Sequence, residues 1–126
     1  LPVINVVFVR TVAIVGTIAL TLTGDRGQLV TYYHYSSSPP ASFANGLYPD
    51  SSATTIPGLN AYEASAGLGI PLPLFEYPVR VNPTVTPVLP QPLVPANKYG
   101  FGGLPEVIFP EGTLPGSVGI PIPVSR

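Results

Sequence analysis

The chain has 126 residues, of which 45% are hydrophobic and only 9% are charged, and its formal net charge is −1. Soluble domains usually carry about 25% charged residues, so this composition predicts a surface that is largely buried against other molecules. The five basic residues are scattered, which argues against nucleic-acid binding, and the lack of cysteine excludes disulfides and thiolate metal sites.

Residues 3–23 form the long proline-free segment with which the chain begins after Pro2. All isoleucine, leucine and phenylalanine side chains in this segment occupy even positions, and all four threonines occupy odd positions. A period of two is typical of a strand with one buried face, and β-branched residues suit a pleated strand. We therefore predict a long N-terminal strand.

A short polar loop, residues 24–27, separates this strand from a second β-rich run that extends to Tyr35. Two such runs around a glycine-bounded loop predict a β-hairpin. On one face the hairpin pairs Leu22 with Leu29, Leu20 with Thr31 and Ile18 with Tyr33. Residues 3–15 then extend past the hairpin without a partner in their own chain.

A single transmembrane helix is the alternative for residues 3–23. As a helix they would span about 32 Å, close to the thickness of the hydrocarbon core of a bilayer. Arg10 lies near the middle of the segment and would cost about 2.5 to 3.5 kcal/mol on insertion, and no basic cluster marks one side. The strand is therefore the preferred prediction, and a membrane contact through these residues is the second.

Residues 36–66 are predicted to be an ordered loop region. Serine and proline interrupt the strand pattern directly after Tyr35. A short helix is predicted between Leu59 and Ala66, with Gly67 as its end.

Residues 67–126 contain 13 of the 18 prolines, with apolar residues between them. Each proline removes a backbone donor, so the pattern argues against a helix and against a central strand. We predict an extended, polyproline-like arm that follows the 1–35 strand-and-hairpin unit and the 36–66 loop region. Residues 69–73 and 119–123 share the pattern Gly-Ile-Pro-x-Pro, either as equivalent docking points or as a product of the biased composition.

Catalytic chemistry has little support in the sequence. His34 is the only histidine, and the six carboxylates are isolated from one another, so no catalytic residue, metal site or cofactor is predicted. The glycine-rich segment 99–103 lacks the Lys-Ser/Thr of a phosphate loop and predicts a chain reversal instead. The aromatic residues Tyr32, Tyr33, Tyr35 and Phe43 leave a stacking platform for a carbohydrate as a less favoured alternative.

These patterns predict a mainly β or irregular chain that serves as a structural subunit rather than as an enzyme. In composition alone the chain is similar to extracellular filament subunits and virion structural proteins. We expect pairing of strands between subunits, with the arm as a clasp, and an extracellular or virion location. The alternative is an accessory subunit of a membrane complex, located in the membrane. The predicted assembly interface consists of Ile4, Val6, Phe8, Val12, Ile14, Ile18, Leu20, Leu22, Tyr33, Ile70, Leu72, Leu74, Phe75, Ile120 and Ile122.

Overall fold

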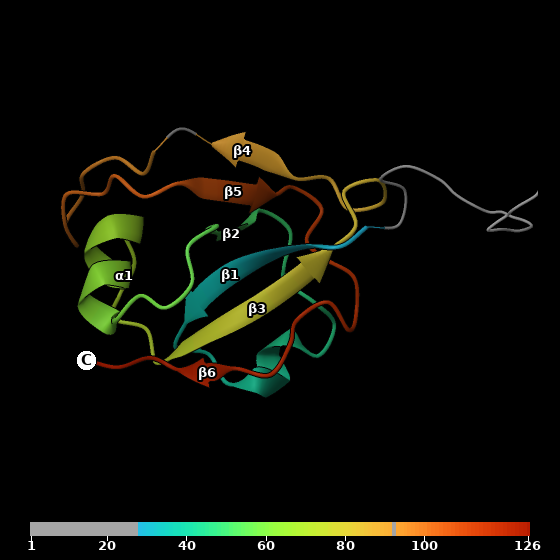
Figure 1. Cartoon of the computed structure of the whole chain (residues 1–126), viewed down its shortest axis with the longest axis horizontal. Helices are drawn as coiled ribbons and strands as arrows, with labels where there is room; N and C mark the ends of the chain where they lie inside the picture. The colour runs from blue at the N-terminus through green and yellow to red at the C-terminus, as the bar shows by residue number, and fades with distance from the viewer. Residues whose placement is uncertain (1–27, 92) are drawn as a thin grey trace, which may run out of the picture.

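The computed structural model describes residues 28–91 and 93–126 (Figure 1). The protein is mainly β, as predicted, and its strands form two three-stranded antiparallel sheets with the orders β1-β3-β6 and β2-β5-β4. The elements in chain order are β1 (Val30–Ser36), a 3₁₀ turn (Pro40–Phe43), β2 (Ser51–Ala53), α1 (Ala61–Leu68), β3 (Phe75–Val81), β4 (Leu89–Gln91), β5 (Glu106–Phe109) and β6 (Ile122–Pro123).

One backbone bridge joins the edges of the two sheets. The amide of Tyr33 donates to the carbonyl of Thr54 at 2.8 Å, and the amide of Thr54 donates to the carbonyl of Tyr33 at 2.9 Å. The spatial order of the strands is therefore β6-β3-β1-β2-β5-β4, which Figure 1 shows from bottom to top. Only β6 and β4 lie at the outer ends of this arrangement.

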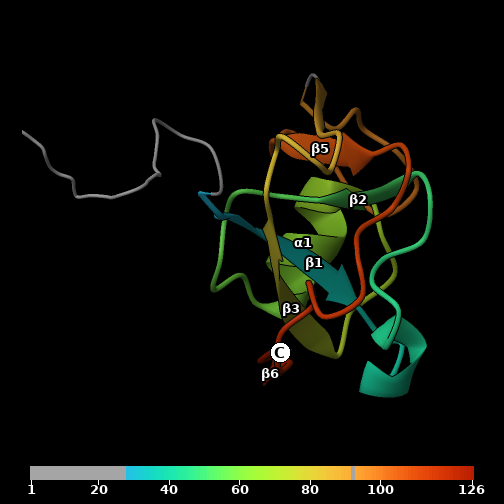
Figure 2. The ribbon, with the colours of Figure 1, turned by 90° about the vertical axis from the view of Figure 1, so that its right-hand side faces the viewer.

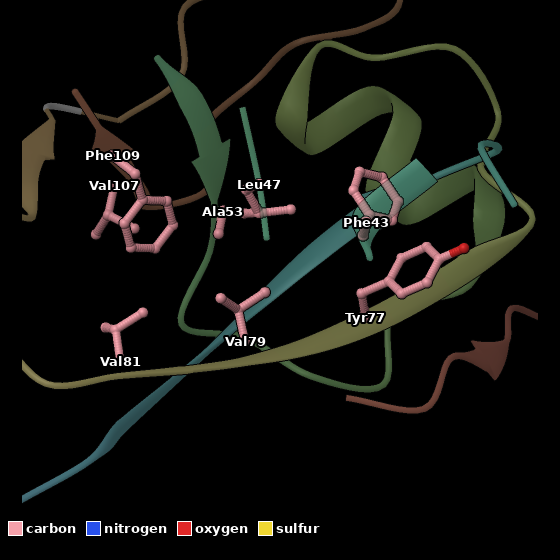
Figure 3. Packing of buried hydrophobic residues seen from close by; sticks show 8 residues of the cluster. All are labelled: Phe43, Leu47, Ala53, Tyr77, Val79, Val81, Val107 and Phe109. Carbon is pink, nitrogen blue, oxygen red and sulfur yellow. The ribbon is translucent and has the colours of Figure 1, made fainter. Parts of the chain in front are cut away.

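The hydrophobic core lies between the sheets. Figure 2 shows β2 and β5 on one side of it and β1 and β3 on the other. Every second side chain of β3 points inward, and the ring of Tyr32 on β1 meets that of Phe109 on β5 edge to face, with 5.7 Å between centroids. The buried cluster consists of Phe43, Leu47, Ala53, Tyr77, Val79, Val81, Val107 and Phe109 (Figure 3).

The structure does not show the extended Pro-rich arm. Residues 67–126 instead supply β3, β4, β5 and β6, and more than half of the buried cluster comes from β3 and β5. Some of the apolar side chains that were expected to clasp neighbours, such as Val79, Val81 and Val107, lie in the core of their own domain, whereas others are exposed. Short strands tolerate the prolines because turns and edges separate them.

A central strand does run through a proline, so the prediction that excluded one was wrong. Pro78 lies in the middle of β3, between β1 and β6. It faces Tyr33, whose backbone groups point away from β3 toward Thr54, so β1 needs no donor from Pro78. The carbonyl of Pro78 points the other way and accepts from the amide of Gly119 at 2.7 Å. The missing N–H therefore costs no bond to β1.

The predicted short helix is present, but it ends two residues later than expected. Asn60 and Glu63 form a reciprocal capping box at its start, and Gly69 ends it in a left-handed conformation with φ of 71°. Gly67 lies inside the helix, where the side chain of Leu104 occupies the space that a Cβ would need. The chain reversal at residues 99–103 is confirmed, because Asn97 and Gly100 bond to each other's backbone groups.

The first strand of the predicted hairpin and the transmembrane alternative both fall on residues outside the described part of the chain. Of the hairpin, the structure describes β1, whose ladder partner is β3. Both backbone groups of Tyr33 are bonded to Thr54, so the predicted pair between Ile18 and Tyr33 is wrong. Within residues 28–91 and 93–126, no helix has the length and hydrophobicity needed to cross a membrane.

Candidate assembly interface

Exposed apolar side chains gather where β1 begins. Leu29, Val85 and Leu114 are each more than half exposed, and all three line an open surface hollow of about 450 Å³. Arg80 is the one charged residue among the lining residues of this hollow. Large apolar side chains around a weakly charged hollow are typical of a surface that contacts another apolar segment.

A second apolar strip follows β6 and the residue that precedes β3. Leu74 and Ile122 are about half exposed, and Ile120 is 87% exposed. Val118 pairs with Val79, whereas Ile122 pairs with Glu76, so the register shifts by one residue between them. The extra residue lies next to Ile120, as in a β-bulge, and the bulge leaves the side chain of Ile120 in solvent.

Proline blocks the outer edge of β6. The amide of Val124 donates to the carbonyl of Leu74 at 3.0 Å, so this pair is hydrogen-bonded. Hydrogen-bonded and non-hydrogen-bonded pairs alternate in an antiparallel ladder. The backbone groups of Ile122 therefore also point toward β3, while the backbone nitrogen of Pro123 points outward. Pro123 has no N–H, so at this position the outer edge of β6 offers no donor to an added strand.

The outer edge of β4 is blocked in the same way. The carbonyl of Phe109 accepts from the amide of Asp50 at 2.8 Å, so Phe109 directs its backbone groups toward β2. The backbone groups of the preceding residue, Ile108, therefore point toward β4, where they pair with those of Leu89. Pro90, the next residue of β4, points outward without a donor. Both outer ends of the six-strand arrangement thus lack donors at these positions.

One stretch of strand edge is open. The backbone N–H and C=O of Tyr33 point away from β3, and by alternation those of Thr31 point the same way. Among the residues that the structure describes, none bonds to the outward amide and carbonyl of Thr31. This open edge, Leu29 to Thr31, is next to the hollow that Leu29 lines.

Of the predicted interface residues, the seven that the structure describes do not form one exposed surface. Residues Ile4, Val6, Phe8, Val12, Ile14, Ile18, Leu20 and Leu22 lie outside the described part of the chain. Tyr33, Ile70, Leu72 and Phe75 are half-buried, and Leu74, Ile120 and Ile122 are exposed. Phe75 packs against the core through the ring of Tyr77, with 5.9 Å between centroids. The exposed three form the strip along β6, and Tyr33 lies at the inter-sheet bridge.

The aromatic platform proposed for carbohydrate is not present. Tyr35 and Phe43 are each only 5% exposed, and Tyr32 packs against Phe109. Burial raises the pKa of the Tyr35 hydroxyl to about 12, while its bond from the Leu59 amide opposes the rise. Tyr35 and Phe43 are thus part of the fold's interior, and the four rings do not share one exposed face.

A buried carboxylate was missed by sequence analysis. Glu76 is 5% exposed, and its Oε1 accepts from the amide of Gly58 at 2.8 Å and from the hydroxyl of Tyr35 at 3.1 Å. These contacts attach the loop before α1 to the outer face of the β1-β3 pair. No local sequence signal marks this network, because its three members are far apart in the chain.

His34 has a structural role. Its Nδ1 lies 2.6 Å from the carbonyl oxygen of Ser52, so this nitrogen carries the proton and donates. Its ring meets that of Phe43 edge to face at 5.4 Å, and burial lowers the pKa of the imidazole below 6.5. Within residues 28–91 and 93–126, no three histidine or carboxylate side chains are close enough to share a metal ion.

The stability of the fold is expected to fall as the pH drops below 6.5. In this window the unfolded chain protonates His34 more readily than the folded one, because burial has lowered the folded-state pKa. The free energy of unfolding therefore rises with pH up to about 6.5 and gains no more from this residue above it. Urea titrations at pH 5 to 8 measure this dependence.

The control is His34→Gln, which keeps a side-chain donor for the Ser52 carbonyl but does not titrate. We expect a flatter pH dependence in this variant. An unchanged slope would show that His34 does not produce the pH dependence.

Comparison with protein-family models, with curated proteins and with solved structures found no match for this chain.

Proposed function

We propose that this protein is a structural subunit that associates with other copies of itself, or with other subunits of a large assembly, through its N-terminal apolar segment. The observation that carries the proposal is the period-two pattern of residues 3–23, which places all the large aliphatic side chains on one face. A strand of this length with an apolar face needs both a ladder partner and a covering surface.

The folded domain supports the proposal in two ways. Its two outer strands, β4 and β6, carry outward prolines, so copies of the domain cannot stack through these edges at random. Its surface still exposes apolar side chains at the β1 hollow and along β6. The outer edges of this domain resist pairing with other strands, but the domain carries an apolar N-terminal segment. Such a domain is suited to associate through that segment.

An aspartate on the even face of the N-terminal segment is expected to abolish the association. In Ile18→Asp an unpaired carboxylate would enter the buried face, at a cost of several kcal/mol. Sedimentation velocity of the full-length chain at micromolar concentration measures the result, and negative-stain microscopy shows whether the particles are ordered.

The matched control is Thr17→Asp, which adds the same charge one residue away on the opposite face. We expect this variant to retain most of the association. A full-length chain that sediments as a monomer before any substitution would refute the proposed function. Equal losses in the two variants would refute burial of one face only.

A further inference from the structure

Phe101 is a large apolar side chain that the fold of a single chain leaves uncovered. It is 92% exposed, more than any other large apolar residue in the described part of the chain. A single exposed ring is not unusual, but this one is held rigidly, and the same chain carries a hollow that fits it. We infer that Phe101 of one copy inserts into the apolar hollow beside the 3₁₀ turn of a second copy.

Backbone bonds hold Phe101 in place from both sides. On one side, the backbone groups of Asn97 and Gly100 bond to each other at 2.9 and 3.2 Å. On the other, the amide of Gly102 donates to the carbonyl of Ala66 on α1 at 2.9 Å. The Cβ that Gly100 lacks would overlap the backbone of Ala66, so the loop is pressed against the helix. A ring on such a loop loses little conformational freedom when it binds, which favours docking.

The hollow that would receive the ring lies between the 3₁₀ turn and residues 116–121. Its volume is about 320 Å³, and none of its nine lining residues is charged. A cavity of about 150 Å³ accommodates benzene, so a phenyl ring fits this volume. The rings of Phe43 and Tyr77 line the hollow, and aromatic rings attract one another edge to face. Ile120, which is 87% exposed, also lines it and would be covered together with the ring.

Charge favours this hollow over the larger one beside β1. Lys98 is exposed in the turn just before Phe101. The larger hollow contains Arg80, so docking there would bring two positive charges together. The hollow beside the 3₁₀ turn has no charged lining residue and avoids this repulsion.

The ring comes from a second copy and not from the same chain. In Figure 1 the loop packs on α1 at the left, whereas the 3₁₀ turn lies to the right of β6 at the bottom. The bonds to α1 keep Phe101 away from the hollow of its own chain. Because ring and hollow are different patches, the contact is head to tail, and each copy can donate one ring and receive another.

This contact rests on the proposed function and adds to it a contact between folded domains. One ring covers much less than the area of about 1,200 to 2,000 Å² that a stable interface buries, so it does not hold two free copies together. Where another contact already gathers the copies, a second weak contact raises the total affinity and orients neighbouring domains. Docking is therefore expected within assembled chains and not in dilute monomers.

The experiment cross-links two full-length variants that each carry one cysteine, since the natural chain has none. Ala96→Cys places a thiol beside the ring, because Ala96 and Phe101 are the next pair after the bridge between Asn97 and Gly100. Asn45→Cys places an exposed thiol next to the lining of the hollow. The two chains differ in length by a tag, are mixed before assembly and are treated with a short bismaleimide.

We expect the mixed dimer to exceed the sum of the two same-chain dimers by about threefold or more, because a head-to-tail contact joins a ring side to a hollow side. Random contact would give equal amounts. The controls move Phe101→Ala between the chains. In the Ala96→Cys chain it removes the docking ring, and the excess should disappear. In the Asn45→Cys chain it should leave the excess, because that chain supplies the hollow. Circular dichroism verifies that each variant is folded.

Sedimentation velocity of the natural chain separates this inference from the proposed function. An excess of mixed dimer that depends on Phe101 in the Ala96→Cys chain alone supports the docking. If the chain assembles without such an excess, or if Phe101→Ala acts equally in both chains, the docking is wrong and the proposed function stands. A natural chain that stays monomeric refutes both.

Discussion

Replacing Phe109 with alanine is expected to remove about 3 to 5 kcal/mol from the free energy of unfolding. The ring is fully buried between the sheets and meets the ring of Tyr32 edge to face. Because domains of this size are stabilised by about 5 to 15 kcal/mol, the loss removes a large share of the total. Urea denaturation followed by tyrosine fluorescence or circular dichroism measures it.

The control is Phe101→Ala, the same substitution at a ring that is 92% exposed. We expect it to change the free energy of unfolding by no more than about 0.5 kcal/mol. Similar values for the two variants would contradict the packing of β5 against the β1-β3 pair. A large effect of Phe101 alone would show that this ring is covered in an assembly.

The strand content was predictable from the sequence, but the sheet partners were not. The β-rich run that extends to Tyr35 correctly placed a strand at β1, and the helical run from Leu59 to Ala66 placed α1 to within two residues. The partner of β1 proved to be β3, which pairs Val30 with Val81, 51 residues further along the chain. Such pairing depends on tertiary packing, and local periodicity does not contain it.

The proline-rich half was mispredicted because prolines were counted without regard to register. Pro78 is compatible with a central strand since it lies where β1 needs no donor. Pro90 and Pro123 are compatible with strands since their nitrogens face outward.

The candidate interface was predictable only in its apolar character. Ile120 and Ile122 were expected at a surface, and they are exposed in the single chain. Phe75 was expected there too, but it packs toward the core, because β3 alternates its side chains between the two faces. The open edge at Thr31 has no local signal, since it exists only because the chain turns away from β1 after Thr54.

Replacing Gly46 with alanine is expected to cost about 2 to 5 kcal/mol of folding free energy. Gly46 has φ of +88°, where an alanine costs about 1 to 2 kcal/mol. Its Cβ would also overlap the carbonyl oxygen of Thr113 and lie 2.7 Å from that of Leu114, and such overpacking adds about 1 to 3 kcal/mol. The clash would also displace the neighbouring residue Leu47, whose side chain is buried in the core and whose carbonyl accepts from the Thr113 amide at 3.1 Å.

The matched control is Gly58→Ala, since Gly58 has a similar φ of +76° and nothing lies within 4 Å of the added Cβ. It should cost only the backbone strain of about 1 to 2 kcal/mol. The difference between the two variants in urea denaturation therefore isolates the contact of the 43–47 loop with residues 112–114. If both variants lose the same stability, that loop is not fixed against Thr113, and the core at Leu47 is more loosely closed than its hydrogen bonds indicate.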